Sequence, residues 1–520
     1  MSKESYYQYV PVAGAELFTA VLLPSEGKYP TVVVRTPYVD GAQEKAEQEI
    51  LACLRESHGT YLQGGYAVVY QHCRGRGKST GDCIPYINER EDTLALYEWI
   101  RQQPFYNGEL YPVGGSYLSS VHLVATPFPT DVKAAILEVQ DRCRYNCNYR
   151  NGFYKIGLHG NWYVGMYKKK SKPCKPYAKE SFHMLPLSEF SRTVFGEPAP
   201  DFDEILQHPD KRDAFWQTRY GGGEAQNALY GARIPILLTT GFYDIYTGGI
   251  FDMWNALDGE TKRMSALVVH PYDHGGTEEK QPVAFEKGRI REQFGDYKRA
   301  FLDAVRGHGK MPFAQGNVTY YEMFGRGWRT DAFTPAAKSV TYPLGEGERT
   351  YTYNPYAPAT FKGGLSANFG GTAWQDPPNG RYDILTFYTP AFEKDTLIKG
   401  KMSATLCVRS DCEDTCFYVR VSLCKTEGDY GLRDDITQIS NTFPTYCPGD
   451  EVELSFTFDE HAFVVKTGER LRIDVSSSAF PLYVRHTNHR GPFAAQTTAR
   501  VAHNTVLLDR STITLPVEAD

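Results

Sequence analysis

The sequence predicts an α/β domain that is interrupted by an insertion and followed by an all-β domain. Three observations lead to this prediction. From residue 6 to residue 140, short apolar runs alternate with helical stretches, and the same alternation resumes at about Arg233. From about Pro335, segments of strand length follow one another with turns between them. The first pattern is typical of a mostly parallel sheet, and the second is typical of a β-sandwich.

The individual elements follow from apolar runs and from helical periodicity. A helix is predicted at residues 89–103, where apolar residues recur at helical spacing between Leu94 and Ile100. Strands of the α/β part are predicted at residues 17–23, 31–35, 67–70, 134–139, 234–241 and 266–269. Strands of the C-terminal part are predicted at residues 402–408, 417–423, 452–458, 471–475 and 505–508.

These elements divide the chain into four segments. Residues 1–140 and 233–334 are expected to form the two halves of the α/β domain, and residues 141–232 the insertion between them. Residues 335–520 are expected to form the β-sandwich, which by itself could equally be a carbohydrate-binding module. A chain of 520 residues is too long for one core, so several domains are expected.

Composition limits the class of protein. Hydrophobic residues make up 41% of the chain, and no apolar run approaches 18 residues, so no transmembrane helix is expected. The net charge of −6 argues against a nucleic-acid binder. The N-terminus has no apolar signal region, which favours a cytoplasmic location. The eleven cysteines are scattered along the chain. The short spacings of Cys143/Cys147 and Cys412/Cys416 are C-x3-C and not C-x2-C, which argues against a zinc site.

The strongest functional signal lies at residues 110–120, which read as a strand, a tight turn and a helix start. Gly114 and Gly115 precede Ser116 at the turn. A serine on such a strained turn has an exposed hydroxyl, and the N–H of the next residue, Tyr117, is placed to stabilise an oxyanion. The pattern G-x-S-x-G would need glycine where the chain has Leu118. A glycine-rich turn with a capping serine is therefore the alternative.

A nucleophilic serine needs a histidine and a carboxylate, and both follow predicted strands. Asp244 comes just after the strand at 234–241, and His274 comes shortly after the strand at 266–269. The order serine, acid, histidine is that of α/β-hydrolases. Asp273 competes with Asp244 as the acid, but a sequence neighbour rarely reaches the ring nitrogen. His270 and His274 as metal ligands at i, i+4 is a weaker alternative, because Pro271 argues against a helix.

These segments together resemble the cocaine-esterase-like (CocE/NonD) hydrolases, relatives of X-prolyl dipeptidyl peptidases and α-amino-acid ester hydrolases. The resembling motifs span nearly the whole chain and lie at residues 35–38, 74–81, 91–108, 114–117, 241–244 and 271–275. The resemblance implies an α/β-hydrolase domain with a helical cap and a C-terminal jelly roll, and it implies that the Tyr38 hydroxyl donates to the oxyanion. The chain departs from the family pattern at Ser119, where glycine is usual, and at Tyr272, where tryptophan is common.

The predicted cap carries an unusual charge pattern. Residues 142–179 contain ten Lys or Arg residues and no Asp or Glu, and aromatic residues are interleaved with them. Such a cap could focus a positive potential on an active-site entrance, or it could be a solvated basic face. Arg142, Arg144 and Arg150, together with the aromatic Trp162, are the predicted substrate-binding residues.

The sequence therefore predicts a serine hydrolase of carboxylic esters or amides, acting through an acyl-enzyme on neutral or anionic small molecules. Ser116 is the predicted nucleophile, His274 the base and Asp244 the acid, and Tyr38 and Tyr117 form the oxyanion hole. No metal or other cofactor, nucleic acid or membrane is expected as a partner, and a homodimer remains an open alternative.

X-prolyl peptidase or amino-ester hydrolase activity is the first alternative. Both need acids that bind an ammonium, and the two positions where amino-ester hydrolases carry them are Tyr246 and Thr247. An inactive glycan-binding protein is the alternative from another class.

Overall fold

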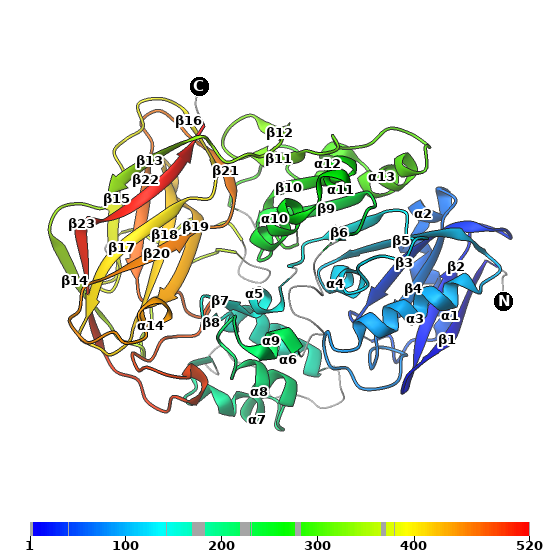
Figure 1. Ribbon diagram of the computed structural model, residues 1–520, viewed down its shortest axis with the longest axis horizontal. Coiled ribbons are helices and arrows are strands. Elements are labelled where there is room, and N and C mark those ends of the chain that lie inside the picture. Colours follow the sequence, from blue (N-terminus) through cyan, green and yellow to red (C-terminus); the bar gives the residue numbers. More distant parts are fainter. Residues whose placement is uncertain are drawn as a thin grey trace.

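The computed structural model describes residues 4–39, 41–141, 143–168, 182–218, 229, 231–275, 282–365, 371–378 and 380–518. Figure 1 shows a β-sandwich on one side and a sheet covered by helices on the other, with short helices below their junction. In this part of the chain no helix is long and apolar enough to cross a membrane.

The α/β part of the molecule is built on one ten-stranded sheet in the order β1-β2-β4-β3-β5-β6-β9-β10-β11-β12. The strands from β4 to β11 are parallel, whereas β1, β2 and β12 pair antiparallel at the two ends. Their bounds are β1 Ser5–Val12, β2 Ala15–Leu22, β3 Tyr29–Thr36, β4 Ala67–His72, β5 Tyr106–Gly115, β6 Ala135–Glu138, β9 Ile236–Tyr243, β10 Ala266–Asp273, β11 Val318–Glu322 and β12 Gly327–Asp331.

Helices cover both faces of this sheet. One face is packed by α1 (Glu47–Ser57), α2 (Gly59–Gln63), α12 (Ile290–Phe294) and α13 (Tyr297–Val305). The other face is packed by α3 (Glu89–Arg101) and α10 (Thr247–Ala256), and α11 (Gly259–Met264) leads into β10. Every residue of β9 and β10 is buried, as expected for strands covered on both sides. The predicted α/β class is confirmed.

Short elements fill the predicted cap. They are α5 (Arg144–Asn148), β7 (Tyr149–Arg150), β8 (Phe153–Tyr154), the π-helix η1 (Ile156–Gly160), α6 (Asn161–Lys168), η3 (Leu187–Glu189), α7 (Phe190–Val194), α8 (Pro200–Ile205) and α9 (Ala214–Thr218). Their aromatic core is continuous with side chains of the sandwich, among them Tyr418, Phe480 and Tyr483. The cap is therefore packed against the sandwich as well as against the sheet.

The C-terminal half forms two antiparallel sheets, as predicted. One contains β20-β17-β23-β16-β21, with β13 and β14 also paired to β23, and the other is β15-β22-β18-β19. A two-residue parallel bridge between Met323 and Phe463 joins this sandwich to the end of β11. The bounds are β13 Lys338–Pro343, β14 Glu348–Tyr353, β15 Leu385–Tyr388, β16 Thr396–Gly400, β17 Ser403–Ser410, β18 Cys416–Lys425, β19 Gly428–Gln438, β20 Val452–Thr457, β21 His461–Val465, β22 Arg470–Ser476 and β23 Ala502–Val517; the short helix α14 is Ile439–Thr442.

Candidate active site

Ser116 lies on a sharp turn between β5 and the helix α4 (Tyr117–Leu123). Its backbone has φ 56° and ψ −126°, a strained conformation for a residue with a side chain. Its N–H donates to the carbonyl of Glu138 on the neighbouring strand at 2.9 Å. Gly114 makes the turn possible, because a Cβ there would lie 2.2 Å from the carbonyl oxygen of Leu118. The tight approach is thus at position 114, and the turn forms without glycine at 118.

Asp244 and His274 meet at the carboxyl edge of the sheet. Asp244 directly follows β9, His274 directly follows β10, and His274 Nδ1 lies 3.0 Å from Asp244 Oδ1. The carboxylate of Asp244 is fully buried and also accepts the N–H of Tyr246 at 3.0 Å and the hydroxyl of Thr240 at 3.2 Å. The carboxylate of Asp273 instead accepts the N–H of Gly275 at 3.2 Å.

The electrostatic surroundings of His274 favour its charged form. Burial opposes the imidazolium, but the charge of Asp244, its hydrogen bond and the charge of Asp273 outweigh it and raise the pKa of His274 above 6.5. His270 differs, since burial lowers its pKa to about 4 and its Nδ1 accepts the N–H of Tyr272 at 3.2 Å. Among the described residues no group of three or more His, Cys, Asp or Glu could hold a metal ion.

Ser116 and His274 line one cavity of about 560 Å³. Among the described residues, its wall holds no Asp, Glu, Lys or Arg. Its other lining residues come mostly from the cap and from the segment after Asp244: Tyr38, Tyr86, Leu158, His159, Asn161, Trp162, Gly165, Met166, Ile245 and Tyr246. The cavity is therefore largely aromatic and apolar, with a few polar groups.

The two predicted oxyanion donors lie beside Ser116. The Tyr38 hydroxyl hydrogen-bonds the Ser116 side chain and accepts the indole N–H of Trp162 at 3.2 Å. Burial of the hydroxyl raises the pKa of Tyr38, which keeps it a proton donor. Tyr117 begins α4, where a backbone N–H has no acceptor within the helix. The Tyr117 hydroxyl donates to Glu89 at 2.6 Å, and this side-chain bond holds the first residue of α4 against α3.

Arg35 and Arg76, from two of the motifs found in the sequence, hold these elements in place. The buried guanidinium of Arg35 donates to Glu89 at 2.8 Å, which is the same carboxylate that Tyr117 binds. Arg76 donates to the carbonyl of Pro37 at 3.0 Å and to that of Met166 at 3.2 Å. It therefore ties the loop that carries Tyr38 to the cap helix α6.

The predicted substrate-binding residues fare differently. Trp162 lines the cavity. Arg144 is buried behind it, with its guanidinium carbon 4.1 Å from the ring centre of Tyr86. Neither Arg144 nor Arg150 lines this cavity, so the structure places both of these predicted residues outside its wall. The Nε and a terminal nitrogen of Arg150 lie 2.7 Å and 3.0 Å from carboxylates of Asp435 and Asp459 in the sandwich.

Among the described residues, the Lys and Arg side chains of the basic span therefore do not line the cavity, although residues 158–166 of the same span do. Arg142 lies outside the described residues, and so do residues 169–179, which hold most of the lysines of the basic span. Counting charges along the sequence could not show that the charge of Arg150 is neutralised by carboxylates. The carboxylates that neutralise this arginine come from a domain almost 300 residues further along the chain.

Sequence reasoning also missed most of the cavity wall. Ile245 and Tyr246 directly follow Asp244, so the motif that identified the acid could have suggested them. Leu158 and His159 lie on the π-helix η1, a type of distortion that is frequent at functional sites. Burial, helped by the nearby charges of Lys155 and Arg144, lowers the pKa of His159 well below 6.5, so this side chain is neutral.

Comparisons with known proteins agree with this architecture. Residues 13–276 match the X-Pro dipeptidyl-peptidase (S15 family) model, and residues 313–512 match the X-Pro dipeptidyl-peptidase C-terminal non-catalytic domain. The chain is 24% identical to cocaine esterase from Rhodococcus sp. (strain MB1 Bresler), over 91% of this chain and 90% of that protein.

Solved structures share the whole fold at low sequence identity. An aminopeptidase from a marine sediment Thaumarchaeota archaeon superposes with a TM-score of 0.84 at 18% identity, over 99% of this chain and 96% of that one. An α-amino acid ester hydrolase superposes with a TM-score of 0.80 at 20% identity, with the same coverage. A CocE/NonD family hydrolase from Staphylococcus aureus gives 0.67 at 16% identity, over 99% and 93% of the two chains.

The family resemblance that the motifs predicted is thus confirmed over both halves of the molecule, from the strand–turn–helix at Ser116 to the C-terminal sandwich. The chain belongs to the X-Pro dipeptidyl-peptidase (S15) family of hydrolases.

Proposed function

We propose that the chain hydrolyses carboxylic esters or amides through an acyl-enzyme on Ser116. The observation that carries the proposal is the single cavity that Ser116 and His274 line, with the buried carboxylate of Asp244 held 3.0 Å from His274. In the proposed reaction the Ser116 hydroxyl oxygen attacks the acyl carbon and His274 takes its proton. His274 then gives that proton to the departing alcohol or amine.

The second half of the reaction uses the same residues in reverse. His274 takes a proton from water, the hydroxide attacks the acyl carbon, and the proton returns to Ser116 as the acid is released. Asp244 orients the imidazole and stabilises its positive charge. The Tyr38 hydroxyl and the Tyr117 N–H would donate to the oxyanion in both halves.

The cavity wall favours an uncharged substrate. A substrate ammonium would need a carboxylate in the wall, and among the described residues the wall has none. The ring of Trp162 and the apolar side chains of Leu158 and Met166 in the wall suit an apolar or aromatic acyl group instead. We therefore propose neutral esters or amides as the main substrates, with anionic ones still preferred to amines because Arg144 lies behind Tyr86.

Peptidase activity is the second candidate. It is supported by the family name and by the aminopeptidase of similar fold, but among the described residues the wall offers no carboxylate that would bind a free N-terminus. Ester and peptide substrates therefore have to be compared directly.

A labelling experiment tests the proposal. A fluorophosphonate should modify the protein at Ser116, and Ser116→Ala should abolish both labelling and hydrolysis, with a loss of roughly 10⁴- to 10⁶-fold in kcat. Circular dichroism should show that the variant is folded. Labelling at another residue, or hydrolysis that survives in the variant, would refute the assignment of Ser116.

A substrate panel tests the proposed specificity. One aryl ester would be offered in neutral, carboxylate-bearing and α-amino forms, beside an X-Pro amide. The expected order of kcat/KM is neutral ester first and the α-amino ester and X-Pro amide last. Faster turnover of the α-amino ester or of the X-Pro amide would show that an ammonium site exists and would favour the peptidase.

A further inference from the structure

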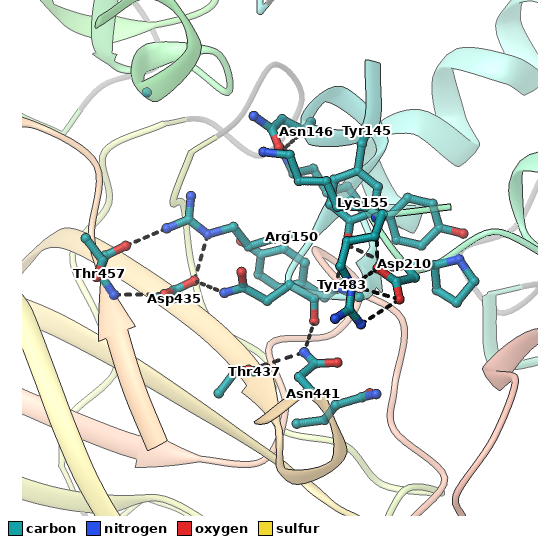
Figure 2. A pocket seen from close by; sticks show the side chains of 18 of the residues that line it. Tyr145, Asn146, Arg150, Lys155, Asp210, Asp435, Thr437, Asn441, Thr457 and Tyr483 are labelled. Atoms are coloured by element: carbon teal, nitrogen blue, oxygen red, sulfur yellow. Dashed lines mark hydrogen bonds and ion pairs between the residues drawn. The ribbon is translucent and has the colours of Figure 1, made fainter. Parts of the chain in front are cut away.

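A second and larger cavity, of about 930 Å³, lies where the cap meets the sandwich. Figure 2 shows side chains of both domains around it: Asn146 and Lys155 come from the cap, and Asp435, Thr437 and Asn441 come from the sandwich. This volume is in the range of small-molecule sites. Nothing in the proposed reaction uses this cavity.

Most charged groups around this cavity are already paired. Arg150 binds Asp435 and Asp459, and its remaining nitrogen donates to the carbonyl of Thr457 at 2.7 Å. At the rim Arg212 lies 2.8 Å from Asp210. Lys401, another lining residue, lies 3.4 Å from Glu460. The other charged lining residues form no ion pair within the described chain; besides Lys155 they are the cations Lys211 and Arg490 and the carboxylates Asp141 and Asp252.

Lys155 is different. Its ammonium donates to the carbonyl of Asn146 at 2.6 Å, and no carboxylate of the described chain lies within 4.0 Å of it. Within the described chain the carbonyl of Asn146 is the one hydrogen-bond acceptor of this ammonium, so two of its three N–H donors have no partner there. Burial lowers the pKa of Lys155, with Arg150 acting in the same direction, while the more distant Asp141 and Asp459 act against it. A cation in this position is stabilised by an anion that enters the cavity.

The neighbour of Lys155 offers a second free group. The side-chain amide of Asn146 lines the cavity and makes no hydrogen bond within the described chain, whereas those of Asn151 and Asn441 are both used. An amide N–H beside an ammonium can bind a carboxylate through both of its oxygens. Tyr145 and Tyr149 also line the cavity, but they are almost fully buried and their rings stack on each other with centres 5.3 Å apart. Their hydroxyls donate to the carbonyls of Pro209 and Ile205.

We propose that this cavity binds a small molecule that carries a carboxylate, with the carboxylate held by Lys155 and Asn146 and the rest of the molecule in the remaining volume of the cavity. This cavity is separate from the one at Ser116, but the two are connected through Ile245 and through the segment that begins at Lys155. Ile245 lines both cavities. Lys155 directly precedes η1, whose Leu158 and His159 line the cavity at Ser116.

Glutarate is a suitable probe, and glutaramide is its uncharged match. Protein that has been blocked at Ser116 with a fluorophosphonate keeps either compound out of the active-site cavity. At neutral pH, glutarate should raise the Tm of blocked protein by roughly 1–3 °C in a saturable manner, and glutaramide should not. If labelling fails, the same titration on unblocked protein still tests this site, because the variants below separate the two cavities.

Two lysine variants locate the binding. Lys155→Met removes the charge and keeps most of the length, so it should abolish the shift. Lys211→Met makes the same change at an exposed lysine that lines the cavity, and should retain the shift. Three results would each overturn the proposal. They are a shift in the Lys155 variant equal to that of the native protein, a shift with glutaramide equal to that with glutarate, and no saturable shift in the native protein.

Chemical protection gives a readout that needs no variant. Reductive dimethylation with formaldehyde and a borane reductant modifies free lysine amines, and peptide mass spectrometry measures each site. Glutarate should lower modification of Lys155 several-fold and leave Lys211 unchanged. Equal modification of Lys155 with and without saturating glutarate would show that the carboxylate binds elsewhere.

Discussion

His274 is the residue whose surroundings make the sharpest prediction about pH. Its pKa is raised above 6.5 because Asp244 and Asp273 together outweigh burial. The proposed base must be neutral, so kcat/KM should fall as the pH drops through a pKa above 6.5. Asp244→Asn removes the main stabilising charge, so this acid limb should move to lower pH while kcat falls by roughly 10⁴-fold. A pH–rate profile of both proteins checks this, and an unmoved limb would contradict the assignment.

Tyr38 permits a second test at the level of one atom. Tyr38→Phe removes the hydroxyl that contacts Ser116 and keeps the ring. Loss of one oxyanion donor should lower kcat by roughly 10²- to 10³-fold with little change in KM. Tyr86→Phe is a matched control on the cavity wall and should leave kcat much closer to that of the native protein. Equal losses in both variants would indicate that the Tyr38 hydroxyl has no special role.

Residue roles could be predicted from sequence only where chemistry and position coincide. Asp244 and His274 each follow a strand, and parallel strands bring such residues to one edge, so their 3.0 Å contact could be anticipated. Arg150 could not be placed, because its partners Asp435 and Asp459 come from another domain. The roles of the triad stay predictions until the variants are measured.

At the level of elements, the junction of β5 and α4 depends on one of its two glycines. Gly114→Ala would place a Cβ 2.2 Å from the backbone of Leu118, whereas Gly115→Ala would meet nothing closer than 3.5 Å. We expect Gly114→Ala to lower the free energy of unfolding by about 1–3 kcal/mol and to reduce labelling of Ser116. Gly115→Ala should fold with near-native stability. Urea unfolding of the two variants makes the comparison, and equal stability would argue against a tight turn at 114.

Elements could be predicted where burial leaves a pattern in the sequence. The predicted strands at 31–35 and 67–70 and the predicted helix at 89–103 match β3, β4 and α3. The strand β13 was not predicted because none of its six residues is buried and only Val340 and Tyr342 in it are half-buried, which is too short an apolar pattern to stand out. The cap helices are a turn or two long, too short for helical periodicity to stand out, and η1 departs from that period altogether.

At the scale of the whole molecule, Arg150 fastens the cap to the sandwich. Arg150→Met would leave two carboxylates, of Asp435 and Asp459, without their partner. We expect a loss of roughly 2–3 kcal/mol in the free energy of unfolding, smaller than for a fully buried pair because the arginine side chain is 23% exposed. Arg212→Met breaks an exposed pair with Asp210 and should change stability little. Similar losses in both variants would show that the cap is held by its aromatic core instead.

The division of the chain into four segments remains a proposal. It is supported by the strand order, because β9 resumes the sheet beside β6 and β13 already belongs to the sandwich. What sequence patterns could not show is that the cap and the sandwich share one aromatic cluster. Contacts between distant segments leave no periodic trace in either of them.

The strand β23 has a consequence for how the chain is made. It pairs with β13, β14, β16 and β17, all of which leave the ribosome before it. Until residues 502–517 have been synthesised, these earlier strands have unpaired edges that can join to other nascent chains. Asp435 and Asp459, the carboxylates that bind Arg150, belong to this sandwich, so the cap can be anchored by them only after that part of the sandwich has folded. A pause between β22 and β23 would therefore leave a chain in which the residues of the turn at Ser116 are already present, while the sandwich against which the cap packs is still incomplete.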